Sequence, residues 1–347
     1  MDTKDLKKEI ERLRATTENF IGVSNAEWYS LFKEEIRNSI AIEGVFVNRE
    51  DLIEVLERNK RTNKQKAAAI LGYFEAASAM YEYANNQFKE KEFTLYMADI
   101  KQIHTLLMRY EKDMGVYIGE IGEFRKSTAQ VTQSKFTPIN HFYIRPAMEL
   151  LIQWCNRKLK KKDIDPVFLA VCVHTWFETI HPFSDGNGRC GRILLSYILI
   201  GTGLVNMAIK GISKKDRNRY YYALESCDDC FEEMSRAVEQ GKTISTQEAD
   251  EAIHKEKFED LKKIILERLN EAVQRLTKSP HLRLSPEAVI PLRDLARLYD
   301  YSQDYLRNLI NRGQLKAHKK GKLWYVCVRD MLEYVNGLSD GLSGRPQ

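Results

Sequence analysis

Hydrophobic residues recur at helical spacing along most of this chain. Between Trp28 and Ile40 the apolar positions lie three and four residues apart, which predicts an amphipathic helix that begins after Asn25 and ends near Gly44. The same spacing predicts further helices over residues 48–59, 63–86, 95–107, 144–160, 166–180, 193–204, 216–240 and 253–276. Leu194 to Ile200 is almost wholly apolar, so that helix is expected to be buried on all sides.

Two stretches interrupt this pattern. Residues 115–136 contain three glycines and then a polar, β-branched run, which predicts a short hairpin or an extended strand, although an irregular surface loop fits as well. Residues 241–248 form a polar break, which indicates a domain boundary. The next predicted helix, residues 253–276, has an apolar stripe along one face. We interpret it as a connector helix whose stripe packs on another part of the protein, and a second subunit is one candidate.

The end of the chain has the pattern of a helix-turn-helix with a small wing. Two short helices are predicted on either side of a turn, and two strands and a final helix follow them. The predicted elements are helices at 292–298 and 303–311, strands at 315–318 and 323–328, and a helix at 329–335.

Composition narrows the class of protein without naming it. The chain has 347 residues, of which 43% are hydrophobic and 30% charged, so two or three ordinary globular domains are expected. The net charge of +5 is too small to require a nucleic-acid partner. No apolar run of about 18 residues occurs and the first residues are charged, so we expect no membrane span or signal peptide, and a cytoplasmic protein.

The six cysteines fit a reducing compartment. Three of them lie in apolar patterns and are expected to act as small core residues. Cys227 and Cys230 form one CxxC pair, which is two ligands short of the usual structural zinc site. We therefore expect no metal there.

The candidate chemistry lies in residues 181–192, between two apolar helices. Gly186 and Gly188 allow consecutive N–H groups to turn toward one anion, at the start of the next helix. Arg189 and Arg192 are three residues apart and can both grip phosphate oxygens. Asp185 is a hard ligand suited to Mg²⁺.

His181 begins the same loop and titrates near neutrality, so it could take a proton from a hydroxyl nucleophile. Each of these residues alone also fits an ordinary turn between helices. Their combination at this spacing predicts phosphate chemistry.

A second candidate site lies at the end of the first predicted helix. Ser39 and Glu43 are four residues apart and share a face. A glutamate is poorly placed at the negative end of a helix dipole. A plain helix terminus is possible, but the misplaced charge suggests a cationic partner elsewhere in the chain.

The loop HPFSDGNGRCGR resembles the motif of the Fic family, H-P-F-x-D/E-G-N-G-R-x-x-R, at every specified position. Fic proteins mostly transfer AMP from ATP to a Ser, Thr or Tyr hydroxyl of a target protein. The resemblance implies that His181 is the general base and that Asp185 holds Mg²⁺. It assigns the phosphates to the rest of the loop: Gly186, Asn187, Gly188, Arg189, Cys190, Gly191 and Arg192.

The segment Ser39 to Gly44 is similar to the inhibitory motif, (S/T)-x-x-x-E-(G/N), of Fic proteins that carry their own N-terminal inhibitory helix. The resemblance implies that Glu43 pairs with Arg192 and keeps it from the γ-phosphate. Some relatives also use this glutamate to remove AMP from a modified target.

The resemblance to Fic proteins also places two further regions near the nucleotide. In Fic proteins a G-x-x-R segment, here ending at Arg125, begins a flap that aligns the target peptide. The flap residues expected at the nucleotide are Val131, Thr132, Gln133 and Ser134. Relatives have a Y-Y-x-x-L pattern near the adenine, which places Tyr220 and Tyr221 there, with Asp228 one turn on; the alternative is one core tyrosine and two on the surface.

The C-terminal segment resembles the winged helix-turn-helix of excisionase-like and MerR-like proteins. Residues 305–329 carry seven basic residues and no acid, which suits DNA, with residues 300–329 as the contact region. A solvated charged face on a protein-interaction module is the alternative. The fold class we expect is mainly α, a Fic helical core with a short β-hairpin flap, and then the winged domain.

The expected domains are residues 1–90 with the inhibitory helix, the catalytic core at 91–240, a connector at 241–284 and the winged domain at 285–347. The predicted function is an autoinhibited protein adenylyltransferase that uses ATP and Mg²⁺ on an unidentified target protein. The resemblance to Fic proteins also makes a homodimer possible. The alternatives are a de-AMPylase that uses Glu43, or a DNA-binding regulator whose Fic-like body senses nucleotide.

Overall fold

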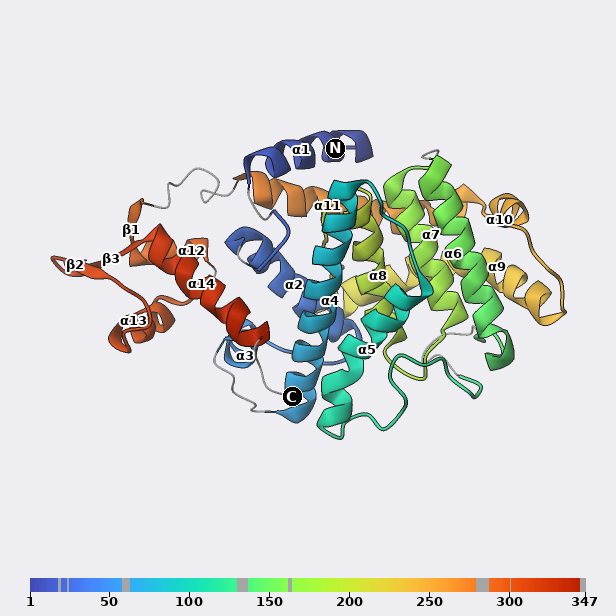
Figure 1. The fold of residues 1–347 in the computed structure, drawn as a ribbon, viewed down its shortest axis with the longest axis horizontal. Coiled ribbons are helices and arrows are strands. Elements are labelled where there is room, and N and C mark those ends of the chain that lie inside the picture. The colour runs from blue at the N-terminus through green and yellow to red at the C-terminus, as the bar shows by residue number, and fades with distance from the viewer. Residues whose placement is uncertain are drawn as a thin grey trace.

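The computed structural model describes residues 1–17, 20–23, 25–57, 63–129, 137–161, 164–278, 287–299 and 301–343. A large helical body makes up most of the molecule, and a small C-terminal domain lies at one end of it (Figure 1). The N-terminal helices are α1 (Thr3–Thr16), α2 (Ala26–Ile42), α3 (Arg49–Leu56), α4 (Lys64–Glu90) and α5 (Met97–Asp113).

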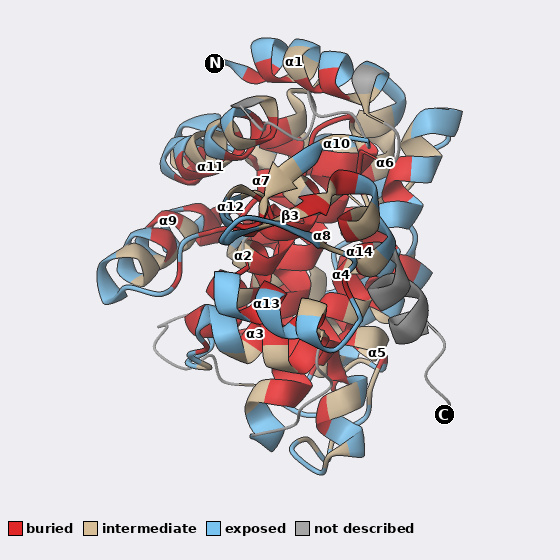
Figure 2. Cartoon of the chain, turned by 90° about the vertical axis from the view of Figure 1, so that its left-hand side faces the viewer, coloured by how far each residue is buried: buried red, intermediate tan, exposed pale blue. Residues whose placement is uncertain are grey.

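The middle of the chain continues the helical body. Its elements are η1 (His141–Tyr143), α6 (Ile144–Lys161), α7 (Pro166–Ile180), α8 (Asn187–Gly201), α9 (Lys214–Glu239), α10 (Thr246–Ala252), η2 (Lys255–Phe258) and α11 (Glu259–Lys278). Helices α7 and α8 pack against each other at the centre, and α4 and α5 pack on α8. Residues 194–200 of α8 are all buried, as predicted, so the helix after the candidate loop is a fixed support (Figure 2).

Side-chain caps define where the predicted N-terminal helices begin. The side-chain oxygen of Asn25 accepts a hydrogen bond from Trp28 N at 3.2 Å, and that of Asn48 from Asp51 N at 2.8 Å. Asn63 caps α4 in the same way. The start of α2 that the sequence predicts is therefore confirmed, and its C-cap residue is Glu43.

The stretch predicted as a hairpin or strand has no regular structure in its described part. Residues 115–129 form turns and bends without a strand. The remaining residues of the predicted flap, including Val131 to Ser134, lie outside the described residues. Of the two possibilities, hairpin and irregular loop, the irregular loop fits residues 115–129.

The connector packs within its own chain. Phe258, Leu261, Ile265 and Leu269 are fully buried in the main hydrophobic core, where α11 contacts α1, α2, α7 and α9. The apolar stripe of this segment is therefore covered without a second subunit. The domain boundary predicted at residues 241–248 stays a prediction.

The C-terminal domain has the winged helix-turn-helix arrangement that the sequence predicts. Its elements are β1 (Val289–Pro291), α12 (Leu292–Leu298), α13 (Gln303–Asn311), β2 (His318–Lys320), β3 (Leu323–Cys327) and α14 (Val328–Ser343). The strands form an antiparallel sheet in the order β1-β3-β2, and β1 is an addition to the prediction. A separate buried cluster forms the core of this domain.

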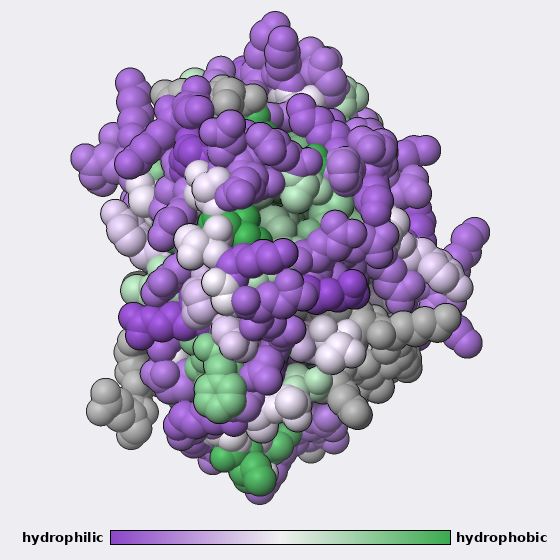
Figure 3. All heavy atoms as spheres, turned by 90° about the vertical axis from the view of Figure 1, so that its right-hand side faces the viewer, coloured by the Kyte–Doolittle hydropathy of each residue, from purple (hydrophilic) through white to green (hydrophobic). Residues whose placement is uncertain are grey.

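The surface at the end opposite the C-terminal domain is mainly hydrophilic, with some hydrophobic side chains grouped in a recess (Figure 3). Among the helices in the described ranges, none combines the length and the hydrophobicity that crossing a bilayer requires.

Candidate active site

His181 lies at the point where α7 ends. It is the C-cap residue, in the left-handed conformation with φ of 51°, a region that most non-glycine residues avoid at a cost of about 1–3 kcal/mol. Its Nδ1 lies 3.4 Å from the carbonyl oxygen of Glu178. Because a carbonyl only accepts, this contact places the hydrogen on Nδ1 and leaves the lone pair on Nε2.

Burial lowers the pKa of His181 to about 4, so the ring is neutral near pH 7. A neutral imidazole with a free Nε2 can accept a proton.

The loop after His181 is anchored by Phe183 and Asn187. Phe183 is fully buried and stacks on the ring of His104, with centroids 3.8 Å apart. The side chain of Asn187 accepts from Phe183 N at 2.9 Å and donates to Phe183 O at 2.8 Å. Phe183 therefore anchors the loop in the core, and the amide of Asn187 is engaged in holding it.

His104 is a supporting residue that the sequence reasoning missed. Gly122 N donates to His104 Nδ1 at 2.9 Å, so Nε2 carries the hydrogen and donates to the carbonyl oxygen of Asp185 at 3.0 Å. Burial lowers the pKa of His104 to about 4, which keeps it neutral. A histidine among the core positions of α5 was the only sequence signal for this role.

The N-terminus of α8 faces the loop without a side-chain cap. Its N-cap is Gly186, with φ of 76°, and a Cβ there would lie 2.7 Å from Met108 Sδ. The first N–H groups of α8 and its dipole therefore favour an anion. Asp185 is exposed beside them, and its Oδ1 accepts from Gly186 N at 2.6 Å.

Arg189 is held by an acidic partner that the sequence reasoning did not identify. Its guanidinium forms a buried ion pair with Glu111 of α5 and lies 3.6 Å from Met108 Sδ. Burial would lower the pKa of Arg189, but Glu111 outweighs that effect and raises it. Arg189 is thus charged and fixed in place, and phosphate binding by it stays a prediction.

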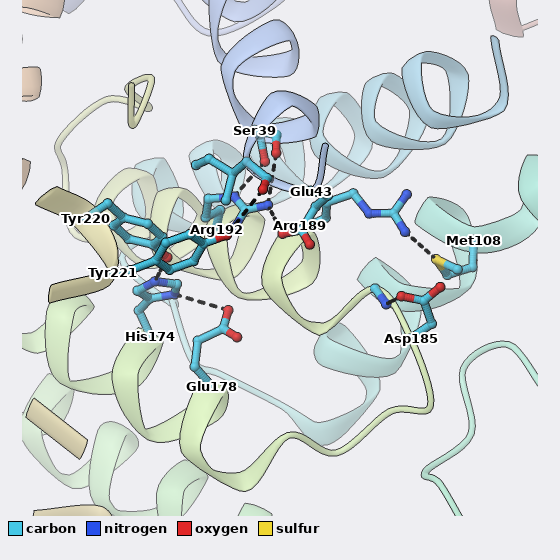
Figure 4. Close-up of polar contacts among 12 residues, drawn as sticks. Ser39, Glu43, Met108, His174, Glu178, Asp185, Arg189, Arg192, Tyr220 and Tyr221 are labelled. Atoms are coloured by element: carbon cyan, nitrogen blue, oxygen red, sulfur yellow. Dashed lines mark hydrogen bonds and ion pairs between the residues drawn. The ribbon is translucent and has the colours of Figure 1, made fainter. Parts of the chain in front are cut away.

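Arg192 joins α8 to the end of α2. Its Nη2 donates to Glu43 Oε1 at 2.6 Å and to Ser39 O at 3.0 Å, and its Nε donates to Ser39 Oγ at 2.8 Å (Figure 4). Desolvation would raise the pKa of Glu43, but Arg192 outweighs it and the pKa is lowered. The Glu43–Arg192 pair that the family motif implied is therefore present.

Two glycines of the loop leave room for carboxyl groups. A Cβ on Gly188 would lie 2.4 Å from Glu43 Oε1, and one on Gly191 would lie 2.1 Å from Glu178 Oε1. Cys190, between them, is fully buried. The close approach of Glu43 to α8 thus requires a glycine at position 188.

The three consecutive tyrosines of α9 have different surroundings. Tyr220 is buried and its hydroxyl lies 2.7 Å from His174 Nε2, whereas Tyr222 is 72% exposed. Tyr221 is half-buried, and its hydroxyl donates to Ile42 O at 3.2 Å. Tyr220 and Tyr221 lie beside Arg192 in Figure 4, but stacking on adenine stays a prediction.

Asp228 lies further along α9 and is buried. It accepts from Thr179 Oγ1 at 3.0 Å, and burial raises its pKa to about 7. This partner occupies one carboxyl oxygen, and a nucleotide contact by Asp228 stays a prediction.

Arg125 ties the base of the predicted flap to the catalytic loop. Its backbone N donates to Pro182 O at 2.9 Å, and its Nε donates to His181 O at 2.8 Å. The same buried guanidinium reaches Ser127 O at 2.7 Å and also donates to Ile139 O. The residue that the motif places at the flap is thus fixed to the backbone of His181.

Glu35 is a third residue, after His104 and Glu111, that the sequence did not identify. Its Oε1 accepts from Tyr73 and Tyr81, and its Oε2 accepts from Asn206 Nδ2 at 2.6 Å. Ser196 of α8 also donates to it, at 3.3 Å. Burial raises the pKa of Glu35 to about 7. This network fixes α2, whose end carries Glu43, to α4 and α8.

The described residues contain no cluster of three or more His, Cys, Asp or Glu side chains suited to a metal ion. Cys227 and Cys230 are both buried, and Cys227 Sγ lies 3.1 Å from Ala223 O. A magnesium ion at this loop would therefore have Asp185 as its protein carboxylate and would draw its other oxygen ligands from phosphates and water.

Comparison with known proteins agrees with this geometry. Residues 94–199 match the Fic/DOC family, and residues 292–339 match a helix-turn-helix domain. The probable protein adenylyltransferase aq_aa38 of Aquifex aeolicus is 28% identical over 306 residues, which is 87% of each chain. The protein adenylyltransferase fic-1 of Caenorhabditis elegans is 32% identical over 105 residues, which is 30% of this chain but only 20% of that protein.

A solved structure with a similar fold is the Fic-domain-containing signaling protein from Bacteroides thetaiotaomicron. It superimposes with a TM-score of 0.59 at 20% identity, and covers 80% of this chain and 98% of its own. Residues 94–199 of the present chain are therefore a Fic/DOC-family domain, and the chain continues into a helix-turn-helix domain at residues 292–339.

Proposed function

We propose that this protein is a protein adenylyltransferase that transfers AMP from ATP to a hydroxyl group of a target protein. The observation that carries the proposal is the neutral His181, with Nε2 unprotonated, next to the uncapped N-terminus of α8. One group accepts a proton and the other binds phosphate, which are the two requirements of nucleotidyl transfer to a hydroxyl. Relatives named protein adenylyltransferases support the choice of AMP.

The reaction follows from these positions. The target hydroxyl loses its proton to His181 Nε2 while its oxygen forms a bond to the α-phosphorus of ATP. The bond from that phosphorus to the oxygen bridging to the β-phosphate breaks, and pyrophosphate leaves. The N–H groups at the start of α8 stabilise the phosphate charge, and Arg192 is placed to bind the outer phosphates once Glu43 leaves it.

Asp185 fits a Mg²⁺ ion because its carboxylate is exposed at the mouth of the phosphate loop. When bound, the ion would neutralise phosphate charge and orient the phosphate chain. The backbone carbonyl of Asp185 is fixed by His104, so the carboxylate is held at a defined position.

The same site is proposed to be autoinhibited. Glu43 and Ser39 occupy the guanidinium of Arg192, so the arginine is not available to a γ-phosphate. Glu43 keeps 36% of its side chain exposed, so its release needs little unpacking. The inhibited state is thus a competition between one carboxylate and a phosphate for one arginine.

The test uses ATP labelled on the α-phosphate, with Mg²⁺, and measures label on protein, including self-labelling. We expect label with Glu43→Gly and little with the unchanged protein, and none with Glu43→Gly/His181→Ala. ATP labelled on the γ-phosphate should leave no label, since it departs as pyrophosphate. Labelling of Glu43→Gly/His181→Ala at the level of Glu43→Gly would overturn the proposal. Label on protein from ATP labelled on the γ-phosphate would overturn it as well.

De-AMPylation can be separated in the same experiment. Self-labelled Glu43→Gly protein is purified and mixed with unchanged protein at equal concentration. Loss of label that requires Glu43 would show that removal of AMP is the activity of the unchanged protein.

A second function, binding of duplex DNA, is proposed for the C-terminal domain. Lys316, Lys319, Lys320 and Lys322 are exposed on and around the wing. Of the seven basic residues in this stretch, Arg307 pairs with Asp304 at 2.8 Å and Arg329 pairs with Glu287. The stretch is therefore less positive than the sequence suggests.

A salt titration of DNA binding tests this second function. Removal of one lysine that neutralises a phosphate should reduce the slope of log K against log salt by about 0.9. Lys319→Gln/Lys320→Gln should therefore lower the slope, and binding that does not depend on salt would exclude this function.

A further inference from the structure

The C-terminal domain is docked on the N-terminal helices through a shared core. Ile53 of α3 belongs to the buried cluster of the C-terminal domain, together with Leu295, Leu306 and Met331. Figure 1 shows this domain next to α3 and α2, and Figure 2 views the molecule from that side. The two parts of the chain are therefore joined by packing as well as by the backbone.

A buried ion pair lies at the same junction. Lys33 Nζ of α2 is 3.5 Å from Glu57 Oε1, and the two side chains are 6% and 0% exposed. The ammonium also lies 4.7 Å from the ring centroid of Tyr29 and 4.8 Å from that of Tyr301. Tyr301 belongs to the C-terminal domain, so this domain supplies one wall of the site that encloses the charge of Lys33.

The contact falls at the start of the second helix of the helix-turn-helix. Ser302 is the N-cap of α13, and Tyr301 and Tyr305 on either side of it stack with ring centroids 5.2 Å apart. Tyr305 is in turn 2.6 Å, hydroxyl to hydroxyl, from Tyr334 of α14. Any movement of α13 therefore acts directly on the ring that covers Lys33.

The connector helix holds α2 at the same end. Arg275 of α11 lies 2.7 Å from Glu34 Oε2 and 2.5 Å from Ser30 Oγ. Lys33, Glu34 and Ser30 lie in the first half of α2, whereas Ser39 and Glu43 at its other end hold Arg192. Ten residues separate Lys33 from Glu43, about 15 Å along one continuous helix at 1.5 Å per residue.

A buried ion pair favours two discrete states over a gradual change. Removal of one partner leaves the other charge buried and unpaired, and this strongly destabilises the folded state. A partly opened site that keeps one charge buried is disfavoured for the same reason. The domain is thus either docked, with Lys33 enclosed, or released, with Lys33 and Glu57 in water. Helix α2 connects this junction to the catalytic loop, because it is one continuous helix that ends at the C-cap residue Glu43.

We propose that the docked C-terminal domain is a regulatory clamp on α2: its contact with Lys33 and Glu57 holds Glu43 on Arg192, and release of the domain activates the catalytic site. This inference rests on the autoinhibition proposed above. The exposed basic side chains around the wing lie on the same domain as the clamp, so a partner that binds there would act on the catalytic site through α13 and α2. Coupling is reciprocal, so loss of the Glu43–Arg192 pair should also loosen the docked domain.

The test reverses the charge at the junction without touching the catalytic residues. Lys33→Glu places two carboxylates together and should release the domain, while Lys33→Glu/Glu57→Lys restores an ion pair of opposite polarity. Glu333→Lys, an exposed charge reversal on α14 of the same domain and outside the basic stretch, is the matched control. The measurements are hydrogen exchange of α12 and α13, and protein labelling from ATP labelled on the α-phosphate.

We expect Lys33→Glu to raise exchange in α12 and α13 and to raise labelling at least ten-fold, toward the level of Glu43→Gly. The double reversal should return both to the starting level, and Glu333→Lys should change neither. Addition of Lys33→Glu to Glu43→Gly should give no further activation. If Lys33→Glu does not fold, Ile53→Asp on α3 releases the same junction and must give the same two responses.

Three results would overturn the clamp: faster exchange with unchanged labelling, unchanged exchange in Lys33→Glu, or failure of the double reversal to restore inhibition. These results differ from failure of the proposed adenylyltransferase activity. If that activity is absent, Glu43→Gly itself carries no label.

Discussion

Arg192 Nη2 lies 2.6 Å from Glu43 Oε1, and Nε of the same guanidinium lies 2.8 Å from Ser39 Oγ. The end of α2 thus occupies, with a carboxylate and a hydroxyl, the arginine that we propose as a ligand of the outer phosphates. Arg192 is 4% exposed, so under the proposed function a phosphate can reach it only after Glu43 and Ser39 release it.

Ser39→Ala should weaken the inhibited state without removing the charge of Glu43. A hydrogen bond to a charged group is worth about 1.5–3 kcal/mol, so ATP should bind roughly ten-fold or more tightly. Calorimetry in a His181→Ala background measures this without turnover. Ser39→Thr keeps the hydroxyl and is the control, and unchanged affinity in Ser39→Ala beside a gain in Glu43→Gly would show that Ser39 has no part in inhibition.

His181 should be neutral well below the ordinary histidine range. Burial lowers its pKa from 6.5 to about 4, so its folded state disfavours the charged form and stability from this residue is lost as pH falls from about 6.5 to 4. Ring proton shifts followed by NMR should show a titration near pH 4 that is missing in His181→Ala. Glu43 raises this pKa, so Glu43→Gly should move the midpoint down and not up. A midpoint at 6.5 would contradict the lowered pKa that burial gives this ring.

Asn187→Ala should destabilise the protein although no ligand is present. It leaves both backbone groups of Phe183 without their partners, and each buried unpaired group costs about 1–3 kcal/mol. Urea unfolding measures the loss. Asn308→Ala, at an exposed helical position, should stay within about 0.5 kcal/mol of the unchanged protein. Equal stability of the two variants would mean that the loop does not depend on Asn187.

Glu35 should make the free energy of unfolding depend on pH. Because burial raises its pKa from 4.5 to about 7, the folded state binds the proton more tightly, and stability from Glu35 falls as pH rises through that window. The fall is roughly 3 kcal/mol at 1.36 kcal/mol per pKa unit. The difference between the unchanged protein and Glu35→Gln at each pH isolates it from other groups.

The glutamine variant should show no such pH dependence. Its amide oxygen can accept from Asn206 Nδ2, as Glu35 does, and its amide nitrogen then faces the hydroxyl groups of Tyr73 and Tyr81. Parallel unfolding curves for the two proteins between pH 4.5 and 7 would show that Glu35 does not titrate there.

Much of the local structure could be read from the chain. Asn25 was recognisable as a cap, and residues 48 and 63 as the starts of helices, and all three side chains accept from N–H groups three residues on. Residues 181–192 were recognisable as a candidate for phosphate binding, because glycines, arginines and titratable side chains of the right kind fall within twelve residues. The pairing of Glu43 with Arg192 needed the family motif, since nothing in local chemistry joins residues so far apart.

Other features follow from contacts between distant segments. Glu111 beside Arg189, His104 beneath Phe183 and the network around Glu35 come from α5, α2 and α8, and the sequence marks none of them as a partner of the others. The enclosure of Lys33 by Tyr301 is of the same kind. A charged residue reads from sequence as a solvated surface group unless its partner is known.

Capping residues, apolar stripes and turn residues were thus enough to predict the helices, the loop at residues 181–192 and the winged domain. These features depend mainly on residues that are close together in the sequence. Which carboxylate meets which arginine, and which domain lies on α2, were decided only by packing, because burial selects ion pairs by their positions in space and not by their separation in sequence.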